Sequence, residues 1–133
     1  MNRILLETSA YSAFRRGNPS ALEIVQLAEE IALTPIVLGE LWSGFSRGSH
    51  RSRNESELRR FLDSPRVLVV PLVEETGRRY STIVTGLLAR GRPIPTNDIW
   101  IAASAMEHGL RIVTSDAHFL EIPQVVVEPL GTN

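Results

Sequence analysis

The chain has 133 residues, of which 43% are apolar, and its net charge is −1. That length fits one domain over residues 1–133, and no apolar run approaches the roughly 20 residues of a membrane helix. Glu7 ends the first apolar run too early for a signal peptide, so we expect a cytoplasmic protein. Cysteine is absent from the sequence, which excludes disulfides and thiolate zinc sites but leaves the compartment undetermined.

The first half of the chain predicts two strands and three helices. A short apolar run predicts a strand over residues 3–6, and Thr8 or Ser9 can cap a first helical turn over residues 10–14. A turn at residues 17–19 leads to a helix over residues 21–30, capped by Ser20, with Leu22, Val25, Leu27 and Ala28 toward the core. A second strand is predicted over residues 31–33, and Pro35 suits the first turn of a helix ending near Phe45.

The second half of the chain also alternates between predicted strands and helices. We expect a polar loop over residues 47–54, a helix over 55–62, a strand over 66–70 and a helix over 74–90. The apolar stripe of that last helix would be formed by Tyr80, Ile83, Val84, Leu87 and Leu88. Residues 91–95 form a stiff, proline-containing connection, and a helix over 98–108 ends at Gly109 in the left-handed conformation. The final strands are predicted over residues 112–114 and 125–127.

Short apolar strands that alternate with helices indicate an α/β fold, with a parallel sheet covered by helices on both faces. In open sheets of this kind, ligands bind outside the carboxyl ends of the strands. Glu7 and Asp116 follow predicted strands, and Asp98 begins a helix after a constrained loop. We therefore expect these three acids on the same rim of the sheet.

Acidic residues interrupt or adjoin segments that otherwise have the character of core. Carboxylates are rarely buried unless they are paired or bind metal, and no neighbouring cation is evident in the sequence around Glu7, Glu40, Asp98 and Asp116. Two such charges about 4 Å apart repel by roughly 4 kcal/mol at an effective dielectric near 20. A cluster of oxygen ligands would favour Mg²⁺ or Mn²⁺, which suits phosphodiester hydrolysis.

Each acid alone has an ordinary structural explanation. Glu7 and Asp98 suit helix N-termini, Asp116 suits a turn after a strand, and Glu40 can face solvent beside Gly39. The ordered set is more specific than any one of its members.

The set resembles the PIN-domain ribonucleases, and within them the VapC-like toxins of type II toxin–antitoxin modules. The resemblance covers nearly the whole chain. It rests on Ile4-Leu5-Leu6-Glu7-Thr8-Ser9-Ala10, on Glu40, on the segment Pro95-Thr96-Asn97-Asp98-Ile99-Trp100-Ile101-Ala102-Ala103, and on Val113-Thr114-Ser115-Asp116 with Phe119.

The resemblance implies a three-layer α/β/α fold with a five-stranded parallel sheet. It also implies Mg²⁺- or Mn²⁺-dependent cleavage of RNA that leaves 5′-phosphate and 3′-hydroxyl ends. Glu40, Asp98 and Asp116 match the metal-binding acids of the family, with Glu7 at the position of the first acid. Thr8, Asn97 and Ser115 adjoin the acids as auxiliary residues that could orient water or phosphate.

The implied partners are an RNA substrate of the transfer or ribosomal class, a cognate VapB-like antitoxin and a second copy of the chain in a homodimer. One departure from the family pattern matters, because position 7 is usually Asp and Glu7 moves the carboxylate by about 1.5 Å. The alternative is therefore a catalytically weak PIN-fold module that binds RNA or antitoxin without cleaving. A phosphatase-like hydrolase is disfavoured, because Ser9 stands where such enzymes have a second acid.

Other side chains have weaker claims to the site. His118 lies near Asp116, but a lone loop histidine is more often a surface residue. An arginine-rich segment could grip RNA phosphates or simply form a solvated face. Trp42 and Trp100 fit core or dimer packing better than base stacking. The arginines of that segment are Arg47, Arg51, Arg53, Arg59 and Arg60, and Arg90 and Arg92 form a second basic pair.

Overall fold

A computed structural model describes residues 2–131, and it confirms the α/β fold with a five-stranded parallel sheet in the order β3-β2-β1-β4-β5. That residues 1–133 form one domain stays a prediction. The strands are β1 (Arg3–Leu6), β2 (Glu30–Leu33), β3 (Val67–Val69), β4 (Arg111–Thr114) and β5 (Val127–Pro129). The helices are α1 (Thr8–Arg15), α2 (Pro19–Leu27), α3 (Pro35–Arg47), α4 (Arg51–Leu62), α5 (Glu74–Ala89), α6 (Thr96–His108) and the short 3₁₀ helix η1 (Ala117–Glu121).

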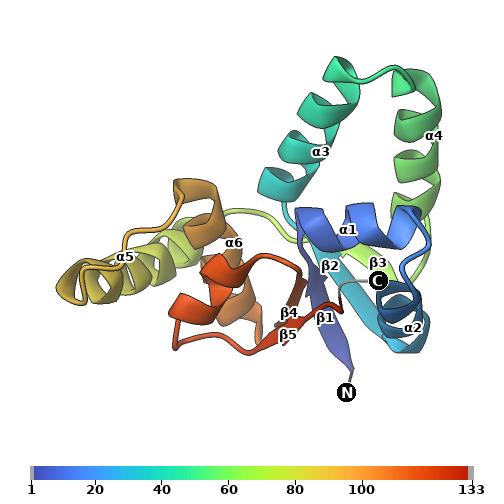
Figure 1. Cartoon of the computed structure of the whole chain (residues 1–133). Coiled ribbons are helices and arrows are strands. Elements are labelled where there is room, and N and C mark those ends of the chain that lie inside the picture. The colour runs from blue at the N-terminus through green and yellow to red at the C-terminus, as the bar shows by residue number, and fades with distance from the viewer. Residues whose placement is uncertain (1, 132–133) are drawn as a thin grey trace.

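The order in which strands are added to the sheet reverses after β3, and this places helices on both faces. It first steps from β1 to β2 to β3, and then returns to β4 and β5 on the other side of β1. Right-handed crossovers therefore put α1 to α4 and α5 with α6 on opposite faces. Figure 1 shows α1 and α2 on one side of the strands and α6 on the other. The three-layer arrangement is confirmed.

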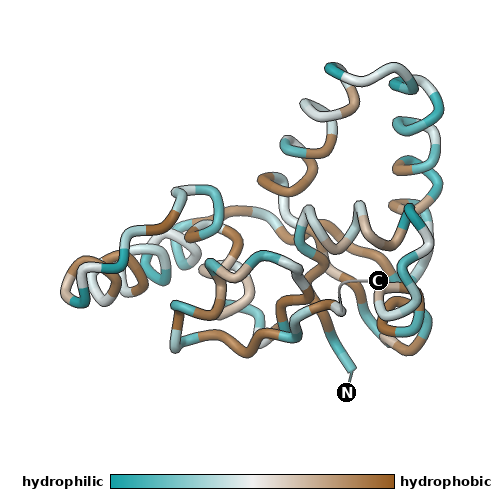
Figure 2. The backbone as a smooth tube through the Cα atoms, in the orientation of Figure 1, coloured by the Kyte–Doolittle hydropathy of each residue, from teal (hydrophilic) through white to brown (hydrophobic). Residues whose placement is uncertain are grey.

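The core lies around the three inner strands. The side chains of Ile4, Leu5 and Leu6 in β1 are completely buried, as are those of Ile112 and Val113 in β4. Figure 2 shows the inner strands in the brown of apolar residues, whereas α4 is largely hydrophilic teal. Strands buried on both faces explain why the sequence shows apolar runs instead of alternation.

Several predicted boundaries were wrong. Residues 47–54 are not a loop, because α3 continues to Arg47 and α4 begins at Arg51, where an ion pair joins Arg51 to Glu55 at 3.2 Å. Leu58 is fully buried and anchors α4. The helix predicted over residues 21–30 begins at Pro19 and ends at Leu27, and the last strand lies two residues later than predicted.

Some predicted faces and caps were also wrong. Leu22, Leu27 and Leu88 are exposed instead of packed in the core, and Asn18, not Ser20, caps α2 by accepting a hydrogen bond from the Ala21 amide. Glu7 is itself the N-cap of α1, where Thr8 or Ser9 was expected. Gly109 ends α6 with φ 65°, as predicted.

Candidate active site

The site lies where the order of strands reverses, beyond the carboxyl ends of β1 and β4. Glu7 directly follows β1, and Asp116 lies two residues beyond β4. Asp98 occupies the first turn of α6 and Glu40 lies within α3. The four carboxylates line one open cleft of about 440 Å³, so the rim expected for three acids also includes Glu40. Ligands of parallel α/β folds bind at this kind of topological switch point.

Glu7 is held by hydroxyl groups from both neighbouring elements. Its Oε1 accepts hydrogen bonds from the Ser9 amide at 3.1 Å, the Ser9 hydroxyl at 2.5 Å and the Thr114 hydroxyl at 2.6 Å. The side chain points from the end of β1 toward the end of β4, and only 5% of the residue is exposed. Among residues 2–131, every hydrogen bond accepted by this carboxyl group falls on Oε1. Oε2 accepts none of these hydrogen bonds and could bind a cation.

Burial raises the pKa of Glu7 above its ordinary value, and the negative charge of Asp98 adds to that effect. The hydrogen bonds from Ser9 and Thr114 oppose it by stabilising the charged form. Burial likewise raises the pKa of Asp98, with further increases from Asp116 and Glu40, against a hydrogen bond from His118 that lowers it. In both acids burial outweighs the stabilising hydrogen bonds, and a bound cation would favour the charged forms.

Glu40 is fixed at both carboxylate oxygens. The Thr8 hydroxyl donates to Oε1 at 2.5 Å, and the Asn97 amide donates to Oε2 at 3.2 Å. Two auxiliary residues thus serve to orient an acid. The side chain of Ser115 has a different place, since Ser115 is exposed and its backbone amide donates to Ser9 Oγ at 3.0 Å.

His118 approaches the acids more closely than the sequence suggested. Its Nδ1 lies 2.9 Å from Asp98 Oδ2 and 3.1 Å from Asp116 Oδ1. The hydrogen bond with Asp98 is the main cause that raises the pKa of His118. The three donor atoms lie within 4.8 Å of one another, a spacing that one metal ion can bridge. The oxygen-rich donor set fits a divalent cation.

Two more residues line the cleft: Ser43, for which no role was predicted, and Arg47, which was expected only as one of the arginines that could grip RNA phosphates. Ser43 and Arg47, one turn apart on α3, line the cleft with the acids, and the Arg47 guanidinium donates to Ser43 Oγ at 2.7 Å. No cation was evident in the local sequence around the acids, and Arg47 enters the same cleft from seven residues after Glu40 in the same helix. Helical spacing would have placed Arg47 on the same side of the helix as Glu40, but the helix was expected to end near Phe45.

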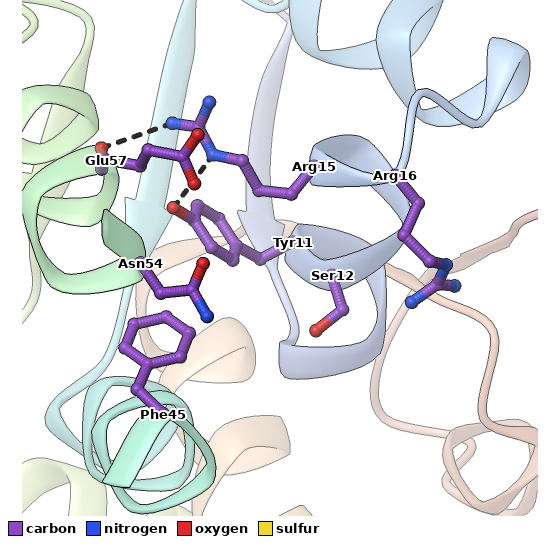
Figure 3. Close-up of a pocket in the computed structure, with 7 residues that line it drawn as sticks. All are labelled: Tyr11, Ser12, Arg15, Arg16, Phe45, Asn54 and Glu57. Carbon is purple, nitrogen blue, oxygen red and sulfur yellow. Dashed lines mark hydrogen bonds between the residues drawn. The ribbon is translucent and has the colours of Figure 1, made fainter. Parts of the chain in front are cut away.

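A second hollow, of about 180 Å³, lies between α1, α3 and α4 (Figure 3). Arg15 crosses it and donates to the Tyr11 hydroxyl at 3.0 Å and to the Glu57 carbonyl at 3.2 Å. Its guanidinium also lies 5.2 Å from the Phe14 ring centroid. The hydrogen bond with the Glu57 carbonyl ties α1 to α4.

The tryptophans divide between two environments. Trp100 in α6 stacks on Tyr80 of α5 with ring centroids 4.2 Å apart, which joins the two helices. Trp42 is 42% exposed on α3. Arg90 and Arg92 both turn toward Glu121, where Arg90 donates to its carbonyl at 2.7 Å and Arg92 lies 3.9 Å from its carboxylate.

Residues 4–125 match the model of the PIN domain. The chain belongs to the PIN-domain family. Among PIN-domain relatives, ribonuclease VapC51 of Mycobacterium tuberculosis is 34% identical over 134 residues, which cover 96% of this chain and 90% of that protein. Ribonuclease VapC2 of Rickettsia felis is 31% identical over 108 residues, 80% of this chain and 79% of that protein.

Solved PIN-domain structures agree with the fold. The crystal structure of VapBC2 from Rickettsia felis, bound to a DNA fragment from its promoter, matches with a TM-score of 0.85 and 27% identity over 96% of this chain and 98% of that chain. DNA-bound VapBC from Salmonella typhimurium has the same TM-score at 23% identity, which bears on the fold alone. The resemblance to VapC-like proteins is confirmed. In residues 2–131, no helix is long and apolar enough to cross a membrane.

Proposed function

We propose that this chain is a metal-dependent endoribonuclease toxin of a type II toxin–antitoxin system, which cleaves RNA to 5′-phosphate and 3′-hydroxyl ends. The observation that supports it most is the convergence of Glu7, Glu40, Asp98 and Asp116 on one cleft at the switch point of the sheet. Relatives named as VapC ribonucleases, at 31–34% identity over most of the chain, support the reaction class.

Asp98 and Asp116 would hold Mg²⁺ or Mn²⁺, with Glu7 Oε2 and Glu40 as further oxygen groups. Once bound, the cation would polarise the phosphoryl oxygen and make a water molecule nucleophilic at neutral pH. Thr8 and Asn97 hold the Glu40 carboxylate in a fixed orientation, so it can position that water molecule. Preorganised acceptors of this kind avoid reorganisation during the reaction.

Arg47 would bind the RNA backbone at the edge of the cleft. It lies on the same wall as Glu40 and close enough to line the same space. A guanidinium recognises phosphate through two parallel hydrogen bonds. The repulsion between an acidic cleft and a polyanion is thereby offset on one side. Ser115, exposed at the rim, is a further candidate for a phosphate contact.

Cleavage of structured RNA with Mg²⁺, with Mn²⁺ or with chelator tests the proposal. We expect cleavage with metal only, and a loss of at least about 100-fold in Asp98→Asn and in Asp116→Asn. Asp63→Asn is the matched control, because Asp63 caps the C-terminal end of α4 with its side chain 68% exposed. End analysis should find 5′-phosphates. Cleavage that persists in chelator, or in both site variants, would contradict the proposal.

The weakly catalytic PIN module is a second candidate, and the position of Glu7 favours it. The carboxyl group caps α1 and accepts three hydrogen bonds, so part of its capacity is used for structure. Comparison of the protein with its Glu7→Asp variant separates the two functions. Metal-dependent cleavage by the protein itself excludes the binding-only module, whereas cleavage by Glu7→Asp alone identifies an attenuated enzyme.

The proposed partners are a VapB-like antitoxin, a second copy of the chain and an RNA of the transfer or ribosomal class. Support for the antitoxin comes from the solved relative of 27% identity that is described as VapBC2 of Rickettsia felis. A neighbouring reading frame that encodes a small DNA-binding protein is the first observation to seek. Its product, when co-purified with this chain, should suppress cleavage. Light scattering of the isolated chain should give twice the monomer mass.

A further inference from the structure

His118 brings a nitrogen donor to a site that otherwise presents oxygen. Its imidazole reaches Asp98 and Asp116. Because the side chain is 49% exposed, close packing around the ring does not account for this position. Two neighbouring interactions hold η1 in place instead. Phe119 is completely buried, and Asp116 Oδ1 accepts a hydrogen bond from the His118 amide at 2.9 Å. The ring is therefore positioned by the same short helix that presents Asp116.

The separations suit a shared cation. Adjacent ligands of an octahedral ion with bonds of about 2.1 Å lie about 3.0 Å apart. His118 Nδ1 lies 2.9 Å from Asp98 Oδ2 and 3.1 Å from Asp116 Oδ1, on either side of that value. Hydrogen bonds have similar lengths, so at these distances His118 can either bind the cation or hydrogen-bond to the two carboxylates. These two roles differ in which metal the site should prefer.

We propose that His118 Nδ1 is itself a ligand of the cation held by Asp98 and Asp116, and that it makes the site selective for Mn²⁺ and other transition metals over Mg²⁺. Imidazole nitrogen suits transition metals, whereas Mg²⁺ is bound by oxygen. A histidine that served only to orient the two carboxylates would influence all divalent cations alike. The inference rests on the proposed metal-dependent function, and it assigns the metal preference to one residue.

Pulsed electron paramagnetic resonance of the Mn²⁺-loaded protein tests the bond directly. In protein labelled with ¹⁵N-histidine, we expect a hyperfine coupling from one directly bound nitrogen. The coupling should vanish in His118→Leu and persist in His50→Leu, a matched variant because His50 is an exposed histidine at the start of α4. Mn²⁺ bound without nitrogen coupling in the unmodified protein would overturn the inference.

Metal affinity gives a second test that does not depend on activity. Mn²⁺ binding is titrated directly, and Mg²⁺ binding by competition, in the unmodified protein and in the two histidine variants. We expect His118→Leu to lower Mn²⁺ affinity about tenfold or more and Mg²⁺ affinity less than about threefold, with His50→Leu unchanged. Equal losses for both metals, or none, would overturn the ligand role. RNA cleavage without nitrogen coupling would reject this inference alone, and nitrogen coupling without cleavage would reject the proposed nuclease alone.

Discussion

The Glu7 carboxyl group serves both the fold and the cleft, and the two uses compete. Its burial and its nearness to Asp98 raise its pKa, although Ser9 and Thr114 donate to it. A group whose pKa is higher in the folded protein than in the unfolded chain contributes its full stability only below the unfolded pKa. That contribution is lost as the pH rises from the ordinary carboxyl value through the folded pKa of Glu7. At neutral pH the burial of this carboxyl group is therefore a cost to the metal-free protein.

We accordingly expect Glu7→Gln to stabilise the metal-free protein at pH 7 by on the order of 1 kcal/mol, or about 3–5 °C in Tm. Glutamine can still accept hydrogen bonds through Oε1, but it has no charge to desolvate. The gain should shrink as the pH falls toward the ordinary carboxyl pKa. Thermal unfolding in chelator at several pH values measures it. A variant that is less stable at every pH would show that the hydrogen bonds to the charged form outweigh the burial.

Arg47 has a separate signature at the residue scale. If it binds phosphate, Arg47→Ala should weaken RNA binding by about threefold to tenfold and reduce the salt dependence by about one charge. Binding is measured with Ca²⁺ in place of Mg²⁺, over a series of salt concentrations. Arg51→Ala is the control, because Arg51 is exposed and already pairs with Glu55 on α4. Equal effects in the two variants would assign RNA binding to the whole basic segment instead.

At the scale of elements, one long side chain adds to the aromatic contacts of Phe61 with Tyr11 and Phe14 that join α1 to α4. Arg15 spans the hollow of Figure 3 to reach the Glu57 carbonyl and the Tyr11 hydroxyl. We expect Arg15→Ala to cost about 1 kcal/mol in the free energy of unfolding, a modest value because the residue is exposed. Arg16→Ala should cost almost nothing, since Arg16 points away from these partners in Figure 3. Denaturant titration compares the two.

Two glycines should respond to alanine with opposite signs. Gly109 ends α6 with φ 65°, a conformation that alanine adopts at a cost of about 1 kcal/mol. Gly77 lies inside α5 with ordinary helical geometry, and an added Cβ there would meet no atom within 4 Å. Gly77→Ala should therefore stabilise the protein by about 0.5–1 kcal/mol. The same denaturant titration measures both changes.

Sequence reasoning located the acids better than it located the ends of elements. Glu7 and Asp116 were found because parallel strands deliver their carboxyl ends to one rim, and this depends only on strand order. The start of α4 was missed because Arg51 to Asn54 have a polar composition. The helix is stabilised by the burial of Leu58, which the sequence alone does not reveal. His118 was underrated because the η1 turn that directs it toward Asp98 has no periodic signal of its own.

At the scale of the whole molecule, metal binding and folding should be coupled. The acids repel one another in the folded protein, and a cation that binds only the folded state stabilises it by about 2.7 kcal/mol at 100 times its Kd. We expect Mn²⁺ to raise Tm and chelator to reverse the change. Asp98→Asn and Asp116→Asn should abolish the increase and Asp63→Asn should retain it. A Tm that does not change when Mn²⁺ is added to the unmodified protein would contradict a metal site in the cleft.

The position of β4 between β1 and β5 has a consequence for the order of synthesis. A growing chain makes β1, β2 and β3 first, and these can pair while the edge of β1 that will receive β4 is still open. Glu7 then lacks the Thr114 hydroxyl, and neither Asp116 nor His118 yet exists. A ribosome that translates this message would thus carry an inert product until β4 has been made and inserted into the sheet beside β1.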